Sequence, residues 1–175
     1  LPKVFESLLH QSFKDFLWII LDDGSTDNTE KVVENFQLLN PFFEIIYKKD
    51  KNRHKFLTVL EGVKMVKTPY FMVVDSDDIY PEDALETLIS EVEKIENQDN
   101  YVAVMGLSAD ENGKIVGDQY PNNGFDGSIF EMRYKHKVRG DKFGIFITKT
   151  YQREISGKDF SQYEGKGYIP QSVIF

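Results

Sequence analysis

The chain has 175 residues, no cysteine and a formal net charge of −8 at pH 7. This length suits one domain with a hydrophobic core, and the lack of cysteine excludes disulfides and thiolate metal sites. The negative charge argues against a general nucleic-acid-binding surface, and no stretch of about 18 apolar residues predicts a membrane span.

The first predicted elements are a helix and a buried strand. Residues 1–13 carry apolar side chains at helical spacing, and no strand precedes them. We therefore expect the natural chain to begin earlier, with a first strand that is missing here. Residues 16–21, "FLWIIL", form a continuous apolar run, which is typical of a strand covered on both faces. In the following "DDGSTDNTE", Gly24 permits a tight turn, and Asp27 with Glu30 has the spacing of a helix capping box.

Strand and helix then alternate as far as residue 107. The apolar spacing predicts, in chain order, a helix over 31–39, a strand over 43–49, a helix over 55–67, a strand over 70–74, a helix after Pro81 and a strand over 101–107. Beyond them, "DENGK" is typical of a hairpin turn, and the pattern weakens until a strand over 143–148 with a short helix behind it. This alternation indicates a parallel α/β sheet with helices on both faces.

Two groups of aspartates directly follow predicted strands. Asp22 and Asp23 follow one strand, and Asp75, Asp77 and Asp78 follow another. Parallel sheets bind ligands at the carboxyl ends of their strands, so both groups are expected at the edge where a ligand would sit.

The chemistry of these aspartates leaves alternatives open. Asp75 and Asp77 offer oxygen ligands that suit Mg²⁺ or Mn²⁺, with a substrate diphosphate supplying the remaining ligands. An acidic surface turn explains the same residues equally well, and a calcium loop less well, because Tyr80 stands where such a loop needs glycine. Asp22 and Asp23 could belong only to a turn, or Asp23 could accept hydrogen bonds from a nucleotide base or ribose.

Two segments together resemble a known family. They read "FESLLHQSFKDFLWIILDDGSTDNTEKVVENF" and, further along, "TPYFMVVDSDDIYPEDAL", and they resemble the family 2 glycosyltransferases of GT-A fold. The resemblance is close over residues 1–90 and looser to the end of the chain. It implies a mixed, mostly parallel α/β sheet in a single domain. Residues 1–107 would form the nucleotide-sugar-binding half and residues 108–175 the acceptor-side half.

The resemblance also implies roles for individual residues. Asp22 and Asp23 belong to the nucleotide-binding element, with Asp23 contacting the base, and Lys55 matches a lysine that can reach the nucleotide. "DSDD" is the DXD motif, in which Asp75 faces the ribose and sugar phosphate and Asp77, with Asp75, holds Mn²⁺ or Mg²⁺ on the donor diphosphate.

Members of the family are inverting enzymes that move a sugar from a nucleotide-sugar to an acceptor hydroxyl, with a carboxylate as general base. We therefore expect a nucleotide-sugar donor, a UDP-sugar being favoured, and a sugar or lipid-linked acceptor in bacterial envelope or extracellular polysaccharide synthesis. No nucleic acid is expected as a partner. The expected location is the cytoplasm, with peripheral association at the inner face of the plasma membrane as an option.

The sequence departs from the family pattern at residues 52–60, around the start of the helix predicted over 55–67. A subgroup reads "NGGKHRALN" where this chain reads "NRHKFLTVL". Lys55 matches, but Arg53 and His54 replace the two glycines and Leu60 replaces the last asparagine.

The general base is the second departure. The subgroup commonly has a glutamate where this chain has Gln171, and an amide cannot accept a proton at neutral pH. Glu164 and Asp141 are the alternative candidates. A rival hypothesis follows, in which the chain is a catalytically impaired member that binds a nucleotide or sugar. A nucleotidyltransferase is a further alternative, although no Gly-rich phosphate loop is visible, and an aspartate phosphatase fits less well.

Two basic stretches have two interpretations each. "KNRHK" over 51–55 and "RYKHKVR" over 133–139 could be solvated charge, or a cationic rim that meets phosphates or an anionic acceptor lipid. For the first stretch the two interpretations, solvated charge and a cationic rim, are equally well supported. For the second stretch solvated charge is preferred.

Overall fold

A parallel pair of strands, β1 (Leu17–Asp22) and β2 (Glu44–Lys49), forms the first sheet. The computed structural model describes residues 1–166, and in it Leu17 pairs with Glu44 and Asp22 with Lys49. Helices α1 (Pro2–Leu9) and α2 (Thr29–Leu39) pack against this pair. The shared core is apolar and strongly aromatic: Val4, Phe5, Leu8, Trp18, Ile20, Val33, Phe36 and Ile45.

The continuous apolar run of β1 is explained by contacts on both of its faces. Trp18 and Ile20 lie in the core shared with α1 and α2. The other face lies under α3 (Lys55–Met65), where a Cβ on Gly62 would come within 2.5 Å of the Leu21 side chain. A strand covered in this way needs apolar residues at successive positions, as the sequence predicted.

The second sheet has three strands in the order β3 (Tyr70–Met72), β5 (Lys142–Ile147) and β4 (Ala103–Leu107). The middle strand β5 runs antiparallel to both neighbours. Helix α4 (Ala84–Glu93) covers one face, where Leu88 and Val92 pack with Ile145 and Ile147. Helices α3 and α5 (Thr148–Ile155) lie on the other face, where Phe146 contacts their shared core.

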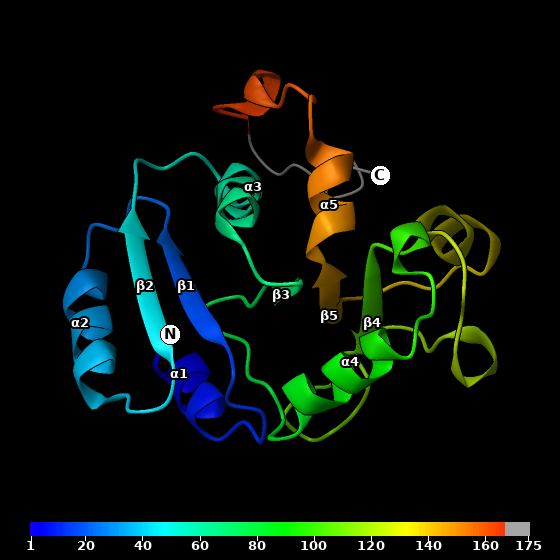
Figure 1. Cartoon of the computed structure of the whole chain (residues 1–175), viewed down its shortest axis with the longest axis horizontal. Helices are drawn as coiled ribbons and strands as arrows, with labels where there is room; N and C mark the ends of the chain where they lie inside the picture. The colour runs from blue at the N-terminus through cyan, green and yellow to red at the C-terminus, as the bar shows by residue number, and fades with distance from the viewer. Residues whose placement is uncertain (167–175) are drawn as a thin grey trace.

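The arrangement in Figure 1 agrees with a mixed α/β fold that has helices on both faces, as expected. The two sheets lie side by side, and the carboxyl ends of β1 and β2 point toward the top of the view, where α3 also lies. Parallel pairing is less extensive than expected, because β5 enters the second sheet from the opposite direction. Within residues 1–166, no hydrogen-bonded ladder joins β1 to β3.

The segment between β4 and β5 contains little regular structure. The predicted hairpin turn is present, because the amide of Asp110 donates to the carbonyl of Lys114 and that of Val116 to the carbonyl of Ser108. Its two arms meet only at an isolated bridge between Ala109 and Ile115. A short helical segment follows over Glu131–Lys135. Of the helices that the structure describes, none has the length and apolarity needed to cross a bilayer.

Candidate active site

Asp22 ends β1 and is a buried carboxylate with internal partners. Its side chain is 5% exposed, and it accepts hydrogen bonds from the Ser25 amide at 2.6 Å and the Tyr47 hydroxyl at 2.5 Å. Burial alone would raise the pKa of Asp22, but the hydrogen bonds from Tyr47 and Ser25 outweigh it and hold the pKa below its usual value. The geometry therefore favours a role for Asp22 in shaping the turn, and its expected contact with a nucleotide stays a prediction.

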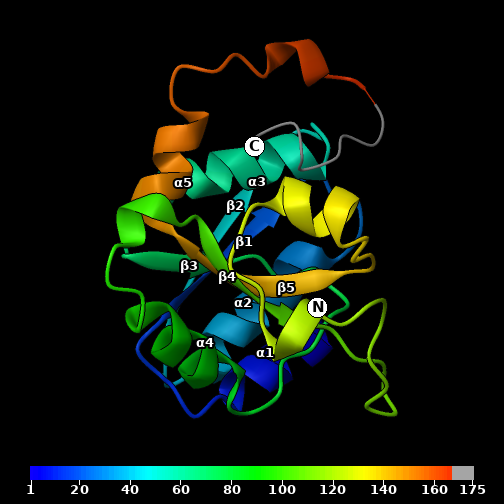
Figure 2. The same cartoon turned by 90° about the vertical axis from the view of Figure 1, so that its right-hand side faces the viewer.

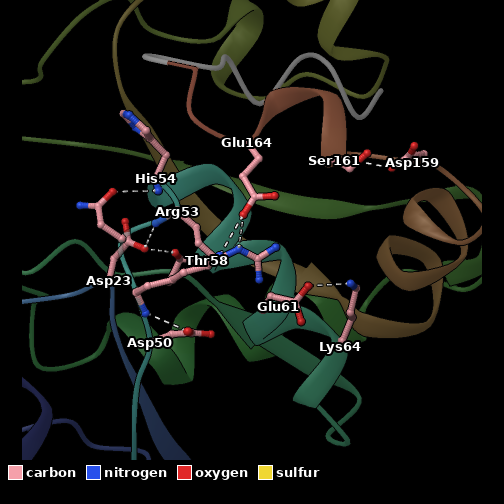
Figure 3. A network of polar contacts seen from close by, with 12 residues as sticks. Asp23, Asp50, Arg53, His54, Thr58, Glu61, Lys64, Asp159, Ser161 and Glu164 are labelled. Carbon is pink, nitrogen blue, oxygen red and sulfur yellow. Dashed lines mark hydrogen bonds and ion pairs between the residues drawn. The ribbon is translucent and has the colours of Figure 1, made fainter.

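Asp23 joins the end of β1 to the loop that begins α3. Its Oδ1 atom accepts the Arg53 amide and the Thr58 hydroxyl, each at 2.7 Å (Figure 3). The two donors come from the loop before α3 and from the first turn of that helix. Asp23 is half-buried, so one carboxylate oxygen fixes the loop while the side chain keeps access to solvent.

The turn at Gly24 brings two loops into direct contact. Gly24 has a φ of +87°, and a Cβ at this position would lie 2.7 Å from the backbone nitrogen of Asn52. Both the backbone conformation and the close approach require glycine here. On the facing loop, His54 precedes α3 with a φ of +75° and a ψ of 140°, a conformation that residues other than glycine rarely adopt.

The acidic loop, defined here as residues 75–78, follows β3. Asp75 accepts an ion-paired hydrogen bond from the Lys55 ammonium, with Oδ2 and Nζ 2.5 Å apart. The side chains are 43% and 60% exposed, so solvent weakens the pair and it can open at little cost. Lys55 stands in the first turn of α3, three residues before Thr58, so this turn reaches both Asp23 and Asp75.

The charges in this loop repel one another. The pKa of Asp78 is raised, first by loss of hydration and then by the negative charges of Asp75 and Asp77. The charge of Asp141 acts in the same direction, whereas that of Lys55 opposes it. Asp141, a candidate general base that stands just before β5, thus acts on the acidic loop through its charge.

The residues of the acidic loop suit a cation shared with a ligand. Within the part of the chain that the structure describes, no group of three or more His, Cys, Asp or Glu side chains could hold a metal ion. Mg²⁺ commonly uses one or two carboxylates and takes its remaining ligands from water and substrate phosphates. The pair of Asp75 and Asp77 agrees with that pattern. A site in which the protein alone supplies all the metal ligands does not fit the described residues.

Glu164, the other described candidate for the base, lies beside the cationic loop 51–55. Its Oε1 atom is 3.6 Å from the Lys51 ammonium and 3.8 Å from Nε of Arg53 (Figure 3). Nε of Arg53 is buried and makes no hydrogen bond within the described residues. Glu164 thus joins the chain after α5 to the loop that also carries Arg53, whose amide donates to Asp23.

A pocket of about 200 Å³ lies under this contact, between α3 and residues 158–164. It is lined by Arg53, Leu57, Glu61, Lys64, Phe160 and Glu164, among others. Ligand sites are usually larger, roughly 300–1,000 Å³, so this pocket would hold only part of a nucleotide-sugar. It shares Arg53 and Glu61 with a small cavity beside Asp22 and Thr58.

The structure thus brings Asp23, Lys55 and Asp75 together around the first turn of α3. It sets Asp141 near the acidic loop and Glu164 near the cations of loop 51–55. Gln171 lies outside the described residues. Thr58 was not predicted as a site residue, although its spacing from Lys55 puts both on one face of the helix. Tyr47 was not predicted either, because it meets Asp22 only through the register of β1 and β2.

Comparison with known proteins identifies the relatives of the chain. It is 30% identical over 94 residues to the glycosyltransferase GlyG of Streptococcus pneumoniae, covering 54% of this chain and 31% of that protein. It is 25% identical over 167 residues to a GalNAc(5)-diNAcBac-PP-undecaprenol beta-1,3-glucosyltransferase of Campylobacter jejuni, covering 91% and 51%. It is also 27% identical over 120 residues to a dolichyl-phosphate beta-glucosyltransferase of Trichomonas vaginalis, covering 67% and 35%.

The chain spans about half of the Campylobacter protein and less of the other two. A family model described as glycosyl transferase family 2 matches residues 1–158, which include every element from α1 to α5. The matched region contains the turn after β1, loop 51–55 and the acidic loop. The chain therefore belongs to glycosyl transferase family 2.

Proposed function

We propose that the chain is the donor-binding domain of an inverting, metal-assisted glycosyltransferase. It would move a sugar from a nucleotide-sugar, with a UDP-sugar favoured, to an acceptor hydroxyl in envelope or extracellular polysaccharide synthesis. The observation that carries this proposal is the first turn of α3, where Thr58 contacts Asp23 and Lys55 contacts Asp75. One helical turn thereby connects the residue expected at the nucleotide base with the residue expected at the sugar phosphate.

The donor would be oriented by these groups. Asp23 uses Oδ1 for its two protein donors, which leaves Oδ2 as an acceptor for a base N–H. Lys55 would turn from Asp75 to the phosphates, because its present ion pair is exposed and weak. A divalent cation on Asp75 and Asp77 would stabilise the negative charge of the departing diphosphate.

A carboxylate must remove the proton from the acceptor hydroxyl. Of the two described candidates, Asp141 is supported by its electrostatic proximity to the acidic loop. Glu164 is held instead by Lys51 and Arg53 on the side of the nucleotide loop. We propose Asp141 as the general base and Glu164 as a residue that positions loop 51–55.

The acceptor class is inferred from the relatives. The name of the Campylobacter protein contains undecaprenol, and that of the Trichomonas protein contains dolichyl phosphate. Both of these compounds are lipids. A lipid-linked acceptor, met by a cytoplasmic enzyme at the membrane surface, is therefore the preferred proposal for this chain.

Calorimetric titration tests the donor site. The full-length protein is titrated with UDP, GDP, CDP and dTDP, with and without Mn²⁺, and metal-dependent binding of one nucleotide is expected. Asp77→Asn should abolish the metal-dependent part of binding while leaving the circular dichroism spectrum unchanged, because a neutral amide is a poor ligand for a hard cation. Asp99→Asn, which changes an exposed aspartate paired with Lys149, is the matched control and should bind as wild type. Unchanged affinity in Asp77→Asn would remove Asp77 from the site.

The second candidate function is a family member that binds donor without turning it over. It is favoured by the position of Glu164, which is engaged by two cations, and by an amide at position 171. Slow hydrolysis of a bound nucleotide-sugar separates the two functions, since a catalytically impaired protein would release no sugar.

A further inference from the structure

Three apolar and four cationic side chains gather on the segment between residues 129 and 139. The apolar members are Ile129, Phe130 and Tyr134, and the cationic members are Arg133, Lys135, Lys137 and Arg139, all of them exposed. We call this set the aromatic–basic surface. The sequence analysis preferred solvated charge for its basic part, but that interpretation leaves the exposed aromatic rings unexplained.

The backbone of this surface is held in place by local hydrogen bonds. Ser128 and Glu131 form a reciprocal capping box, in which Oγ of Ser128 accepts the Glu131 amide and Oε2 of Glu131 accepts the Ser128 amide. After the helical turn, the Val138 amide donates to the carbonyl of Met132, and the Val138 side chain is 4% exposed. The segment is thus capped at one end and anchored at the other, and its aromatic side chains are left outside.

The exposed rings form one patch. Phe130 and Tyr134 are each 70% exposed, and their ring centroids are 4.7 Å apart. Ile129, beside them, is 42% exposed. Single exposed apolar residues are common on proteins, but adjacent ones on an ordered turn mark a surface that contacts another apolar phase.

The charge around the patch indicates which kind of apolar partner it contacts. The chain carries −8 overall, yet this segment has four cations between residues 128 and 139. Its one acid, Glu131, pairs with Lys135 at 3.5 Å on the exposed surface, where solvent weakens the pair. Aromatic rings that insert at the headgroup level, with lysine and arginine beside them, are the pattern of proteins that bind anionic bilayers. A second apolar patch at the end of α2, with Leu38, Leu39 and Phe42, carries less positive charge: the Lys14 ammonium lies 5.1 Å from the Phe42 ring centroid, and Glu34 and Glu44 are near it in the sequence.

The surface lies on a different side of the molecule from the first sheet. Figure 2 shows its helical turn, in yellow, at about the height of α3, and Figure 1 shows the same segment beyond β4, away from β1 and β2. Its connection to the candidate active site runs along the chain. The chain runs from Arg139 directly through Asp141 into β5. Contact with a bilayer here would bring the region of Asp141 close to the headgroups.

We propose that the aromatic–basic surface binds the surface of an anionic phospholipid bilayer. The rings of Phe130 and Tyr134 enter the interface, and Arg133, Lys135, Lys137 and Arg139 meet the lipid phosphates. This inference rests on the proposed function, which places the protein at the membrane surface, and deepens it by assigning the residues that contact the bilayer; donor binding does not require them.

Vesicle co-sedimentation of the full-length protein tests this inference. Phosphatidylcholine vesicles with and without phosphatidylglycerol are compared at low and high salt, and binding is expected only with phosphatidylglycerol at low salt. Arg133→Glu/Lys137→Glu and Phe130→Ser/Tyr134→Ser should each weaken binding by about tenfold or more, because each removes one of the two attractions.

Two control variants make the same chemical changes elsewhere. Lys31→Glu/Lys67→Glu alters the net charge equally at exposed lysines, and Leu38→Ser/Phe42→Ser removes exposed apolar side chains from the end of α2. Both should bind vesicles as wild type. Equal losses in a test variant and its control, or no vesicle binding by wild type, would overturn the proposal. Nucleotide titration of the same variants stays unchanged under this proposal, so its failure is distinguishable from failure of the donor site.

Discussion

His54 adopts a backbone conformation that is usually reserved for glycine. Its φ is +75° at the start of α3, at a position where the resembled subgroup has glycine. Loop 51–55 therefore keeps a glycine-like path although its residues differ from the family pattern. The strain of such a conformation costs on the order of 1–3 kcal/mol, and the surrounding contacts compensate for it.

His54→Gly is expected to raise the free energy of unfolding by about 1 kcal/mol, because relief of strain exceeds the extra entropy of glycine in the unfolded chain. Urea denaturation measures this change. His10→Gly, at a histidine with a φ of −93°, is the control and should bring no gain. A loss of stability in His54→Gly would show that the histidine side chain, and not the backbone, determines this position.

The turn after β1 and the loop before α3 act as one structural unit through Gly24. Gly24→Ala should destabilise the protein for two reasons, the positive φ and the contact of 2.7 Å between the new Cβ and the Asn52 nitrogen. Gly157→Ala isolates the first reason, because Gly157 has a φ of +73° and a Cβ added there would meet no atom within 4 Å. We expect a loss of about 1 kcal/mol at Gly157 and a further loss of roughly 1–3 kcal/mol at Gly24.

The same pair of variants tests the link between this unit and the donor site. Gly24→Ala pushes the turn away from loop 51–55, which carries the amide that Asp23 accepts, so nucleotide affinity should fall with stability. Gly157→Ala should leave affinity unchanged. Equal stability losses at the two glycines would mean that the loops separate without cost and that their contact does not shape the site.

At the scale of the whole molecule, local patterns predicted the elements but not their pairing. The helices, the strands and the acidic groups at strand ends followed from spacing and composition, because those features are encoded in neighbouring residues. The place of β5 between β3 and β4 depends on contacts distant in sequence, such as Gly144, where a Cβ would lie 2.2 Å from the Val104 carbonyl oxygen. The hydrogen bonds of Asp22 with Tyr47 and of Asp23 with Thr58 could not be predicted for the same reason, because their partners are distant in the sequence.

A buried polar side chain, Gln11, connects the first sheet and its helices to the second, and from here these two parts are called the halves of the molecule. Gln11 is 1% exposed. Its Nε2 donates to the carbonyls of Ser7 and Pro81, and its Oε1 accepts the Leu85 amide. It thereby ties the end of α1, in the core of the first sheet, to the start of α4, which covers the second.

Gln11→Leu should lower the free energy of unfolding by about 1–3 kcal/mol, since it leaves the amide of buried Leu85 without the Gln11 acceptor and removes the Gln11 donor from two carbonyls, of which that of Pro81 keeps the Ala84 amide. Trp18, the single tryptophan, reports on the first sheet by fluorescence, while circular dichroism reports on the whole chain. In the variant the two urea transitions should separate, because the halves lose their polar connection. Gln37→Leu, which removes the bond of an exposed side chain to the Ile45 carbonyl, should keep them coincident. Coincident transitions with an unchanged midpoint in Gln11→Leu would show that apolar packing alone couples the halves.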